Sequence, residues 1–282
     1  MKNSNVLPSR SDLPPVKSTS AGFSHKHWYF SRGKIILNDS LSKPGLHKKF
    51  RPNDKFALAD HQDGLHRLAY NEYITLEHAL AYLAKADTIP HRTEGESVVL
   101  SFVPATTRRI LDLGTGDGRL LSLLLLHCPD AEGVGIDFSP TMIDAANQRF
   151  DGESLVRILS HDLNDRLPDM GQFDAIVSSF AIHHCENARK RSLYAEIFNL
   201  LTPGGVFCNL EHVSSATPSL HSRFLGDLGS TPDDEDSGNI LLDVETQLAW
   251  LRQIGFGDVD CYWKWLELSL FGGFRPTKSL IG

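Results

Sequence analysis

Three glycines at alternate positions follow an apolar segment and form the most chemically informative part of the sequence. Residues 110–118 read Ile-Leu-Asp-Leu-Gly-Thr-Gly-Asp-Gly, so Gly114, Thr115 and Gly116 stand where a buried strand would turn into a helix. Glycine has no Cβ, and its backbone can therefore turn tightly and approach a ligand closely. Open α/β sheets bind ligands at the carboxyl ends of their strands, which makes this loop a candidate binding site.

Two acids, Asp112 and Asp117, flank the loop and restrict the kind of ligand it can hold. Dinucleotide sites use the spacing G-x-G-x-x-G and direct backbone amides at a pyrophosphate, but Arg119 occupies the position of the third glycine here. No Gly-Lys-Ser/Thr follows, which excludes a P-loop. Carboxylates repel phosphates and can accept a hydrogen bond from an ammonium group. The loop thus favours a cofactor with an amino-acid tail and no phosphates, and S-adenosylmethionine fits that description.

A further acid, Asp137, ends the next apolar segment, 25 residues after Asp112. A carboxylate at this place can accept hydrogen bonds from both hydroxyls of a ribose. A single acid after a strand is usually only a cap, but its pairing with the glycine loop makes Asp137 a specific candidate for cofactor binding.

Histidines are the candidate catalytic groups on the substrate side. His183 and His184 follow the fourth apolar segment, and His212 follows Glu211 at the end of the fifth. A histidine can act as a general base near neutral pH, and we name His184 and His212 as the candidates; packing and capping are the structural alternatives. The four cysteines are scattered with no C-x-x-C pair, and we predict no metal site.

These residues require an α/β scaffold, and the chain alternates between short apolar runs and helical stretches as such a scaffold does. We predict a doubly wound sheet with helices on both faces. Its strands would lie at 109–113, 133–137, 156–160, 173–178 and 206–211, and its helices would begin near 118, 139 and 188.

The final apolar segment, 259–271, alternates in polarity. It is predicted to form an antiparallel closing hairpin that breaks at Gly272-Gly273. Within it, Trp263 and Trp265 should share one face and Lys264 should point to the other.

Composition divides the 282-residue chain into parts. Residues 1–60 are predicted to be a basic, partly disordered extension, because residues 1–51 contain ten lysines and arginines and two acids while the whole chain has a net charge of −7. Residues 61–105 are predicted to be a helical cap, with helices at 65–86 and 93–102. Residues 106–282 would form the main domain, with an insertion at 213–245 that could act as a lid.

Composition also bears on location and partners. The scattered cysteines fit a reducing compartment, and the longest apolar run, 120–126, is far shorter than the roughly 20 residues that a membrane span requires. We therefore expect a cytoplasmic protein with no membrane contact, although the basic, serine-containing N-terminus would also suit organelle targeting. The acidic body argues against tight RNA binding, and the sequence leaves the oligomeric state open.

Five segments, in order, resemble those of class I (Rossmann-like) S-adenosylmethionine-dependent methyltransferases. They are Leu111-Asp-Leu-Gly-Thr-Gly-Asp-Gly118, Gly135-Ile-Asp-Phe-Ser-Pro-Thr-Met142, His161-Asp-Leu163, Phe173-Asp-Ala-Ile-Val-Ser-Ser-Phe-Ala-Ile-His-His184 and Leu201-Thr-Pro-Gly-Gly205. The resemblance runs from about residue 89 to the C-terminus. It implies a seven-stranded, mostly parallel sheet with one antiparallel strand, S-adenosylmethionine as the cofactor and S-adenosylhomocysteine as the product.

The resemblance also implies roles for individual residues. The loop residues Asp112, Gly114, Thr115 and Gly116 would belong to the cofactor site, with Asp137 on the ribose. The other cofactor contacts would be Phe138 and Met142 beside the adenine, Asp162 and the Leu163 backbone at its amino group, Ser179 at the methionine part, and Arg92 at its carboxylate.

Three functions remain open at this point. The segment Val177-Ser-Ser-Phe180 lacks the Asp/Asn-Pro-Pro-aromatic turn of methylases that act on base amino groups, so methyl transfer to a small molecule is the leading hypothesis. The second is tRNA wobble-uridine modification, because Ile89-Pro-His-Arg92 and the closing hairpin look similar to carboxy-S-adenosylmethionine synthase; a tRNA methyltransferase is a variant of it. The third is a protein that binds S-adenosylmethionine without turnover, since the glycine loop speaks only for binding.

Overall fold

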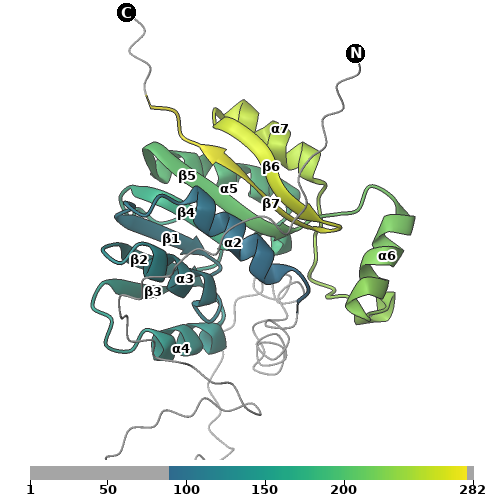
Figure 1. Cartoon of the computed structure of the whole chain (residues 1–282), viewed down its shortest axis with the longest axis horizontal. Coiled ribbons are helices and arrows are strands. Elements are labelled where there is room, and N and C mark those ends of the chain that lie inside the picture. The colour runs from purple at the N-terminus through teal and green to yellow at the C-terminus, as the bar shows by residue number, and fades with distance from the viewer. Residues whose placement is uncertain (1–88, 278–282) are drawn as a thin grey trace, which may run out of the picture. The chain divides into compact units, whose positions relative to one another are not determined.

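The computed structural model describes residues 89–277, which form a seven-stranded sheet with helices on both faces (Figure 1). The strands are β1 (Arg109–Leu113), β2 (Glu132–Asp137), β3 (Val156–Ser160), β4 (Phe173–Ser179), β5 (Leu201–His212), β6 (Gly257–Trp265) and β7 (Leu268–Phe274). The helices are α2 (Arg92–Phe102), α3 (Arg119–His127), α4 (Pro140–Arg149), α5 (Asn187–Leu200), α6 (Pro218–Leu228) and α7 (Val244–Ile254), with short 3₁₀ turns η3 (Ile182–His184) and η4 (Pro232–Asp234).

The strand order places several strand ends at one edge of the sheet. The order is β3-β2-β1-β4-β5-β7-β6, in which β1 to β5 pair in parallel and β7 runs antiparallel to both of its neighbours. The carboxyl ends of β1, β2, β4 and β5 therefore share an edge, and the chain reverses its direction of winding between β1 and β4. Such a switch point is where open α/β sheets bind ligands. The predicted doubly wound sheet with one antiparallel strand is confirmed.

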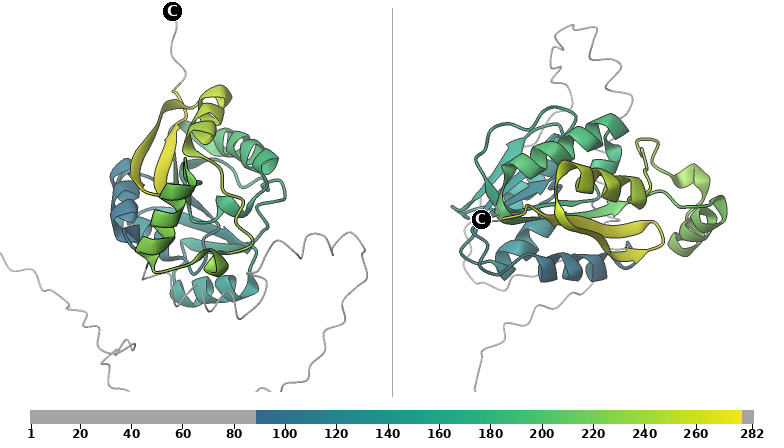
Figure 2. Two further views of the ribbon diagram at one scale, coloured as in Figure 1. Left: turned by 90° about the vertical axis from the view of Figure 1, so that its right-hand side faces the viewer. Right: turned by 90° about the horizontal axis from the view of Figure 1, so that it is seen from above.

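Two apolar cores hold the helices on the sheet. One contains Val99 of α2 and lies on the face covered by α2 and α3, and the other contains Tyr194 of α5 and lies on the face covered by α5 and α7. Neighbouring strand residues such as Ile110 and Leu111 enter opposite cores, because successive side chains of a strand point to opposite faces. Seen from above, the two helical layers lie on opposite sides of the sheet (Figure 2).

The predicted strands at 109–113 and 156–160 coincide with β1 and β3, and the helix predicted at 93–102 is α2. The sequence analysis did not find α7. That helix has clear end signals, since the Asp243 side chain accepts a hydrogen bond from the Thr246 backbone N–H at 2.7 Å and Gly255 follows with a φ of 113°. The predicted extension at 1–60 and the helix at 65–86 lie outside the described residues.

The insertion predicted at 213–245 contains α6 and η4, and α6 stands apart from both helical layers, beyond the β6–β7 turn (Figure 1). On β6, Trp263 is half-buried against Gly95 of α2 and Lys264 is exposed, as the alternation predicts. None of the helices described between residues 89 and 277 is both long enough and apolar enough to cross a bilayer.

The predicted break of the last strand at Gly272-Gly273 is wrong, because β7 continues through both residues to Phe274. A Cβ placed on Gly272 would lie 1.9 Å from the carbonyl oxygen of Phe207 on β5. Glycine is therefore present here because β7 approaches the backbone of β5 too closely for any side chain, and it does not end the strand.

We expect Gly272→Ala to lower the free energy of unfolding by about 1–3 kcal/mol or more, since the added methyl group meets backbone that cannot rotate away. Thermal and urea unfolding would measure the loss. Gly226→Ala is the matched control: a Cβ at this helical position meets nothing within 4 Å, so it should stabilise α6 by about 0.5–1 kcal/mol. Equal stability of the Gly272→Ala variant and the wild type would contradict the role assigned to Gly272.

Candidate active site

The glycine loop joins β1 to α3 in a conformation that side chains rarely adopt. Gly114 and Gly116 have φ values of 66° and 57°, which are in the left-handed region that favours glycine. A Cβ on Gly114 would lie 2.2 Å from the Cβ of Ala181, whereas a Cβ on Gly116 would meet no atom within 4 Å. The loop is fixed to the sheet by the Thr115 backbone N–H, which donates to the Ile136 carbonyl at 2.9 Å.

Asp112 lies below this loop and supports it. The Thr115 hydroxyl donates to Oδ2 of Asp112 at 2.7 Å, while Oδ1 is buried without a hydrogen-bond partner among the described residues. Burial raises the pKa of Asp112 to about 7, although the Thr115 hydrogen bond opposes the shift. Asp112 and Thr115 therefore shape the loop from beneath, and neither of them lines the pocket above it.

Asp137 connects three parts of the site. Its Oδ2 accepts a hydrogen bond from the Gly116 backbone N–H and its Oδ1 accepts one from the Ser139 backbone N–H, both at 2.9 Å. The carboxylate thus links the end of β2 to the glycine loop and to the start of α4. Burial raises the pKa of Asp137, and the backbone hydrogen bonds oppose that shift.

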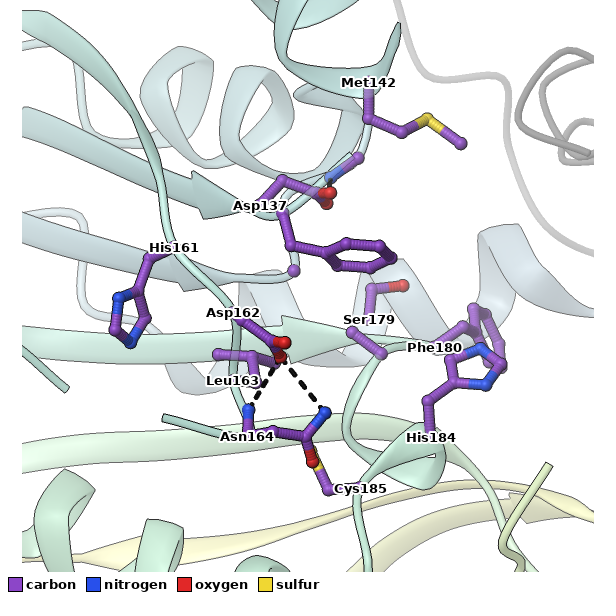
Figure 3. Close-up of a pocket in the computed structure, with 14 residues that line it drawn as sticks. Asp137, Met142, His161, Asp162, Leu163, Asn164, Ser179, Phe180, His184 and Cys185 are labelled. Carbon is purple, nitrogen blue, oxygen red and sulfur yellow. Dashed lines mark hydrogen bonds between the residues drawn. The ribbon is translucent and has the colours of Figure 1, made fainter. Parts of the chain in front are cut away.

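A pocket opens over the loop at the carboxyl edge of the sheet, with about 620 Å³ of free space including its mouth. We call it the glycine-loop pocket. Figure 3 shows Asp137 and Met142 on one side of it and Asp162 and Asn164 on the other. The predicted residues that line the pocket are Gly114, Gly116, Asp137, Phe138, Met142, Asp162, Leu163, Ser179 and His184; the lining residues that sequence reasoning missed are His161, Asn164, Phe180, Ala181 and Cys185.

Two residues of the pocket wall carry buried polar atoms without a partner. The Ser179 hydroxyl, at the end of β4, and Nε2 of His161 have no hydrogen-bond partner among residues 89–277. Buried polar atoms are normally hydrogen-bonded, so these two are exceptions in the wall of the pocket. Asp162 is already engaged, because its Oδ1 accepts hydrogen bonds from the backbone and side-chain nitrogens of Asn164 at 2.9 and 3.1 Å.

Arg92 does not line the glycine-loop pocket. Its Nε donates to Oε1 of Glu96 at 3.0 Å, and Arg119 donates to the same buried carboxylate at 2.8 Å. The Arg92 guanidinium carbon also lies 5.4 Å from the centre of the Phe180 ring. Arg92 therefore supports a pocket wall through Phe180, which itself has an unusual φ of 52°.

A second cavity, of about 600 Å³ including its mouth, adjoins the first, and we call it the histidine cavity. Its lining residues are Ile89, Phe180, His183, His212, Phe224, Leu228, Asp236, Asn239 and Leu268. Phe180 lines both hollows. The two predicted catalytic histidines are thus separated, because His184 faces the glycine-loop pocket and His212 the histidine cavity.

Each histidine of the cavity is paired with a buried glutamate. His183 Nδ1 lies 2.5 Å from Oε1 of Glu211, and His212 Nε2 lies 2.9 Å from Oε2 of Glu267. Glu267 was missed in the sequence analysis, because it lies 55 residues from His212 along the chain, in the β6–β7 turn. Only the topology of the sheet brings the two together.

The surroundings of the histidines set their basicity. Burial and the neighbouring His183 lower the pKa of His184 to about 4, so this imidazole is neutral and a weak base at neutral pH. Burial raises the pKa of Glu267, but hydrogen bonds from His212, Ser215 and His221 outweigh it and lower the value to about 2. The residue with an ionised partner, His212, is therefore the stronger candidate base. No cluster of three metal-ligating side chains occurs among residues 89–277.

The raised pKa of Asp112 predicts a pH dependence of stability. Between about pH 4 and 7 the folded chain retains a proton that the unfolded chain has lost, so stability should fall as the pH rises through this window. We expect Asp112→Asn to remove this fall. Relative to the wild type, the variant should gain on the order of 1–3 kcal/mol between pH 5 and pH 8.

Urea unfolding at the two pH values would measure this gain, and the exposed Asp144→Asn on α4 would serve as the control. An identical pH dependence in the wild type and in Asp112→Asn would show that Asp112 is ionised throughout.

Comparison with known proteins agrees with this geometry. Residues 110–205 match a protein family described as Methyltransferase domain. An uncharacterised methyltransferase of Mycobacterium bovis is 33% identical over 127 residues, which is 45% of this chain and 60% of that protein. A demethylmenaquinone methyltransferase of Thermus thermophilus is 39% identical over 106 residues, or 37% of this chain and 47% of that protein.

A carboxy-S-adenosyl-L-methionine synthase of Helicobacter hepaticus is 24% identical over 203 residues, which is 64% of this chain and 84% of that protein. The chain thus spans about 60% of the length of the mycobacterial relative and less than half of the Thermus one.

Solved structures share the fold at low sequence identity. An O-methyltransferase family protein from Burkholderia thailandensis superposes with a TM-score of 0.54 at 23% identity, covering 66% of this chain and 57% of that one. Human N-acetylserotonin methyltransferase in complex with S-adenosylmethionine gives a TM-score of 0.50 at 19% identity, covering 65% and 52%. Residues 110–205 thus match a methyltransferase domain, and the strand order agrees with the fold that these solved methyltransferases share.

Proposed function

We propose that this protein transfers a methyl group from S-adenosylmethionine to a small-molecule acceptor. The observation that carries the proposal is the glycine-loop pocket, in which the left-handed glycines, Asp137 and Ser179 meet at the carboxyl edge of the sheet. The match of residues 110–205 to the methyltransferase domain supports the reaction class. The relative named as a demethylmenaquinone methyltransferase supports a small acceptor.

The charges of the pocket fit this cofactor better than a dinucleotide. Asp137 and Asp162 line it, and neither lysine nor arginine is among its described lining residues. A diphosphate would therefore bring negative charge toward two carboxylates without a cation to receive it. S-adenosylmethionine carries two positive charges, on its sulfur and its ammonium group, against one carboxylate, so its net charge is opposite to that of the pocket.

Different residues of the pocket would bind different parts of the cofactor. Asp137 would accept hydrogen bonds from the ribose, Phe138 and Met142 would flank the adenine, and the Ser179 hydroxyl would bind the methionine part. Bound there, S-adenosylmethionine supplies an electrophilic methyl group on a positively charged sulfur. The protein's contribution is to orient this group toward the acceptor and to exclude water, which is how positioning lowers a barrier.

The carboxy-S-adenosylmethionine alternative has less support. It rested on the similarity of Ile89-Pro-His-Arg92 and of the closing hairpin to that synthase, yet Arg92 pairs with Glu96 and is not a lining residue. The relative with that activity is also less similar, at 24% identity.

We expect Asp137→Ala to weaken the binding of S-adenosylhomocysteine by about 1–3 kcal/mol, the usual cost of removing a hydrogen-bonded charged acceptor. Isothermal titration calorimetry on the full chain would measure the affinity, with NAD as the competing ligand class. Asp144→Ala is the control, because Asp144 is an exposed aspartate of α4 outside the pocket.

Since Asp137 also accepts two backbone hydrogen bonds, Asp137→Asn would be measured in parallel with a thermal unfolding check. An unchanged affinity in both folded variants would refute the ribose role. Tight binding of NAD and none of S-adenosylhomocysteine would refute the cofactor.

A further inference from the structure

The lining of the histidine cavity indicates which class of methyl acceptor the protein binds. This inference rests on the proposed function. We propose that the cavity binds an uncharged, largely apolar aromatic acceptor that bears a hydroxyl group, and that His212, held by Glu267, removes the proton of that hydroxyl. The first support is the position of the cavity beside the glycine-loop pocket. It shares Phe180 with the glycine-loop pocket, so its contents lie next to the cofactor site.

The walls of the cavity favour a flat apolar molecule. Five of its nine lining residues are Ile89, Phe180, Phe224, Leu228 and Leu268. Phe224 is itself almost fully buried and its ring centre lies 5.2 Å from that of His212. An aromatic ring that packs against these groups from the cavity would gain the contact area and the offset packing that aromatic pairs prefer.

The charges of the cavity exclude an anionic acceptor. Neither lysine nor arginine is among its described lining residues, and its one carboxylate is that of Asp236. A carboxylate or phosphate on the acceptor would lose water without gaining a cation, which disfavours its binding. Lys190, the cation next to His183, is buried and donates its ammonium protons to the Ile240 carbonyl and to Asn187.

The Glu267 carboxylate determines which nitrogen of His212 carries the proton. It is fully buried and ionised, and its two oxygens lie 2.9 Å from His212 Nε2 and from His221 Nδ1. An acceptor-only group at this distance requires Nε2 of His212 to be protonated, which leaves the lone pair on Nδ1. The carboxylate also stabilises the imidazolium that forms when Nδ1 takes up a proton.

Other titratable groups near His212 do not replace this pairing. Glu211 bonds the His212 backbone N–H at 2.9 Å and pairs with His183, whose ring centre lies 5.8 Å from that of His212. Burial, first, and the nearby His212 and Lys190 keep the pKa of His183 well below its usual value. His183 thus stays neutral and serves as a hydrogen-bonding group for the acceptor.

The group transfer balances with these parts. The acceptor oxygen forms its new bond to the methyl carbon, and the sulfur–carbon bond breaks with its electron pair left on sulfur. The hydroxyl proton passes to Nδ1 of His212. The positive charge that was on sulfur therefore ends on the imidazolium, beside the Glu267 carboxylate.

The test uses the full chain saturated with S-adenosylhomocysteine and three probes of one shape: 4-nitrophenol, nitrobenzene and 4-nitrobenzoate. We expect 4-nitrophenol to bind at least tenfold more tightly than 4-nitrobenzoate and several-fold more tightly than nitrobenzene. Because the nitrophenolate anion is coloured, its absorbance also reports transfer of the phenol proton to His212. The proton then stays in the site as an imidazolium paired with the phenolate, so the bound phenol should become coloured at lower pH than the free phenol, whereas 4-nitrobenzoate brings a negative charge with no such proton. Equal or tighter binding of 4-nitrobenzoate, or no binding of any probe, would overturn the proposal.

Variants assign the effect to the named residues. His212→Gln should abolish the shift in the ionisation of bound 4-nitrophenol, and Glu267→Gln should reduce it, while S-adenosylhomocysteine affinity stays within twofold of the wild type. His127→Gln is the control, since His127 is the last residue of α3, its ring bonds the Val103 carbonyl, and it lines neither hollow. A shift that persists in His212→Gln would refute the base.

The affinity for S-adenosylhomocysteine separates this inference from the proposed function. If the wild-type chain does not bind S-adenosylhomocysteine, the cofactor assignment is refuted. If it binds S-adenosylhomocysteine but does not prefer the phenol, only the acceptor class is refuted.

Discussion

The hydrogen bonds that the Asp137 carboxylate accepts are the constraint on which the binding edge depends. A buried carboxylate is costly unless its oxygens are satisfied, and here they are satisfied by the backbone of Gly116 and Ser139. The left-handed loop and the start of α4 are therefore held in place by the same group that we propose binds the ribose. Under that proposal one side chain both supports the pocket and binds the cofactor.

The same rule operates deeper in the molecule, where buried acids keep basic groups in defined orientations. Glu96 receives both Arg92 and Arg119, Glu211 receives His183, and Glu267 receives His212 and His221. Such pairs contribute little net stability, because desolvation offsets much of the attraction. They do fix the orientation of each basic side chain, which is what a reaction site requires.

Much of the fold and the residues around the glycine loop could be predicted from the sequence, whereas the partners of the histidines could not. The glycine loop and Asp137 could be predicted because their chemistry lies in local spacing, and β1 to β5 because each contains a short apolar stretch between helical segments. Glu267 could not, since it becomes a partner of His212 only after β7 returns beside β5. Gly272 misleads for the same reason: a glycine between apolar residues suggests a turn, and only the closeness of Phe207 explains it. Likewise, the sequence does not distinguish His184 from His212, and only the structure shows that burial lowers the pKa of His184.

Among the described residues, Phe180 alone lines both hollows; it stands in a sparsely populated backbone conformation, and Arg92 lies against its ring. The two hollows therefore share one wall, the Phe180 ring. Any rotation that enlarges one chamber takes volume from the other, so two occupants must reach a joint fit and neither chamber has a fixed size of its own. Substrate selectivity in such an arrangement is a property of the ternary complex, and a survey of acceptors made without the nucleoside in place would measure a differently shaped cavity.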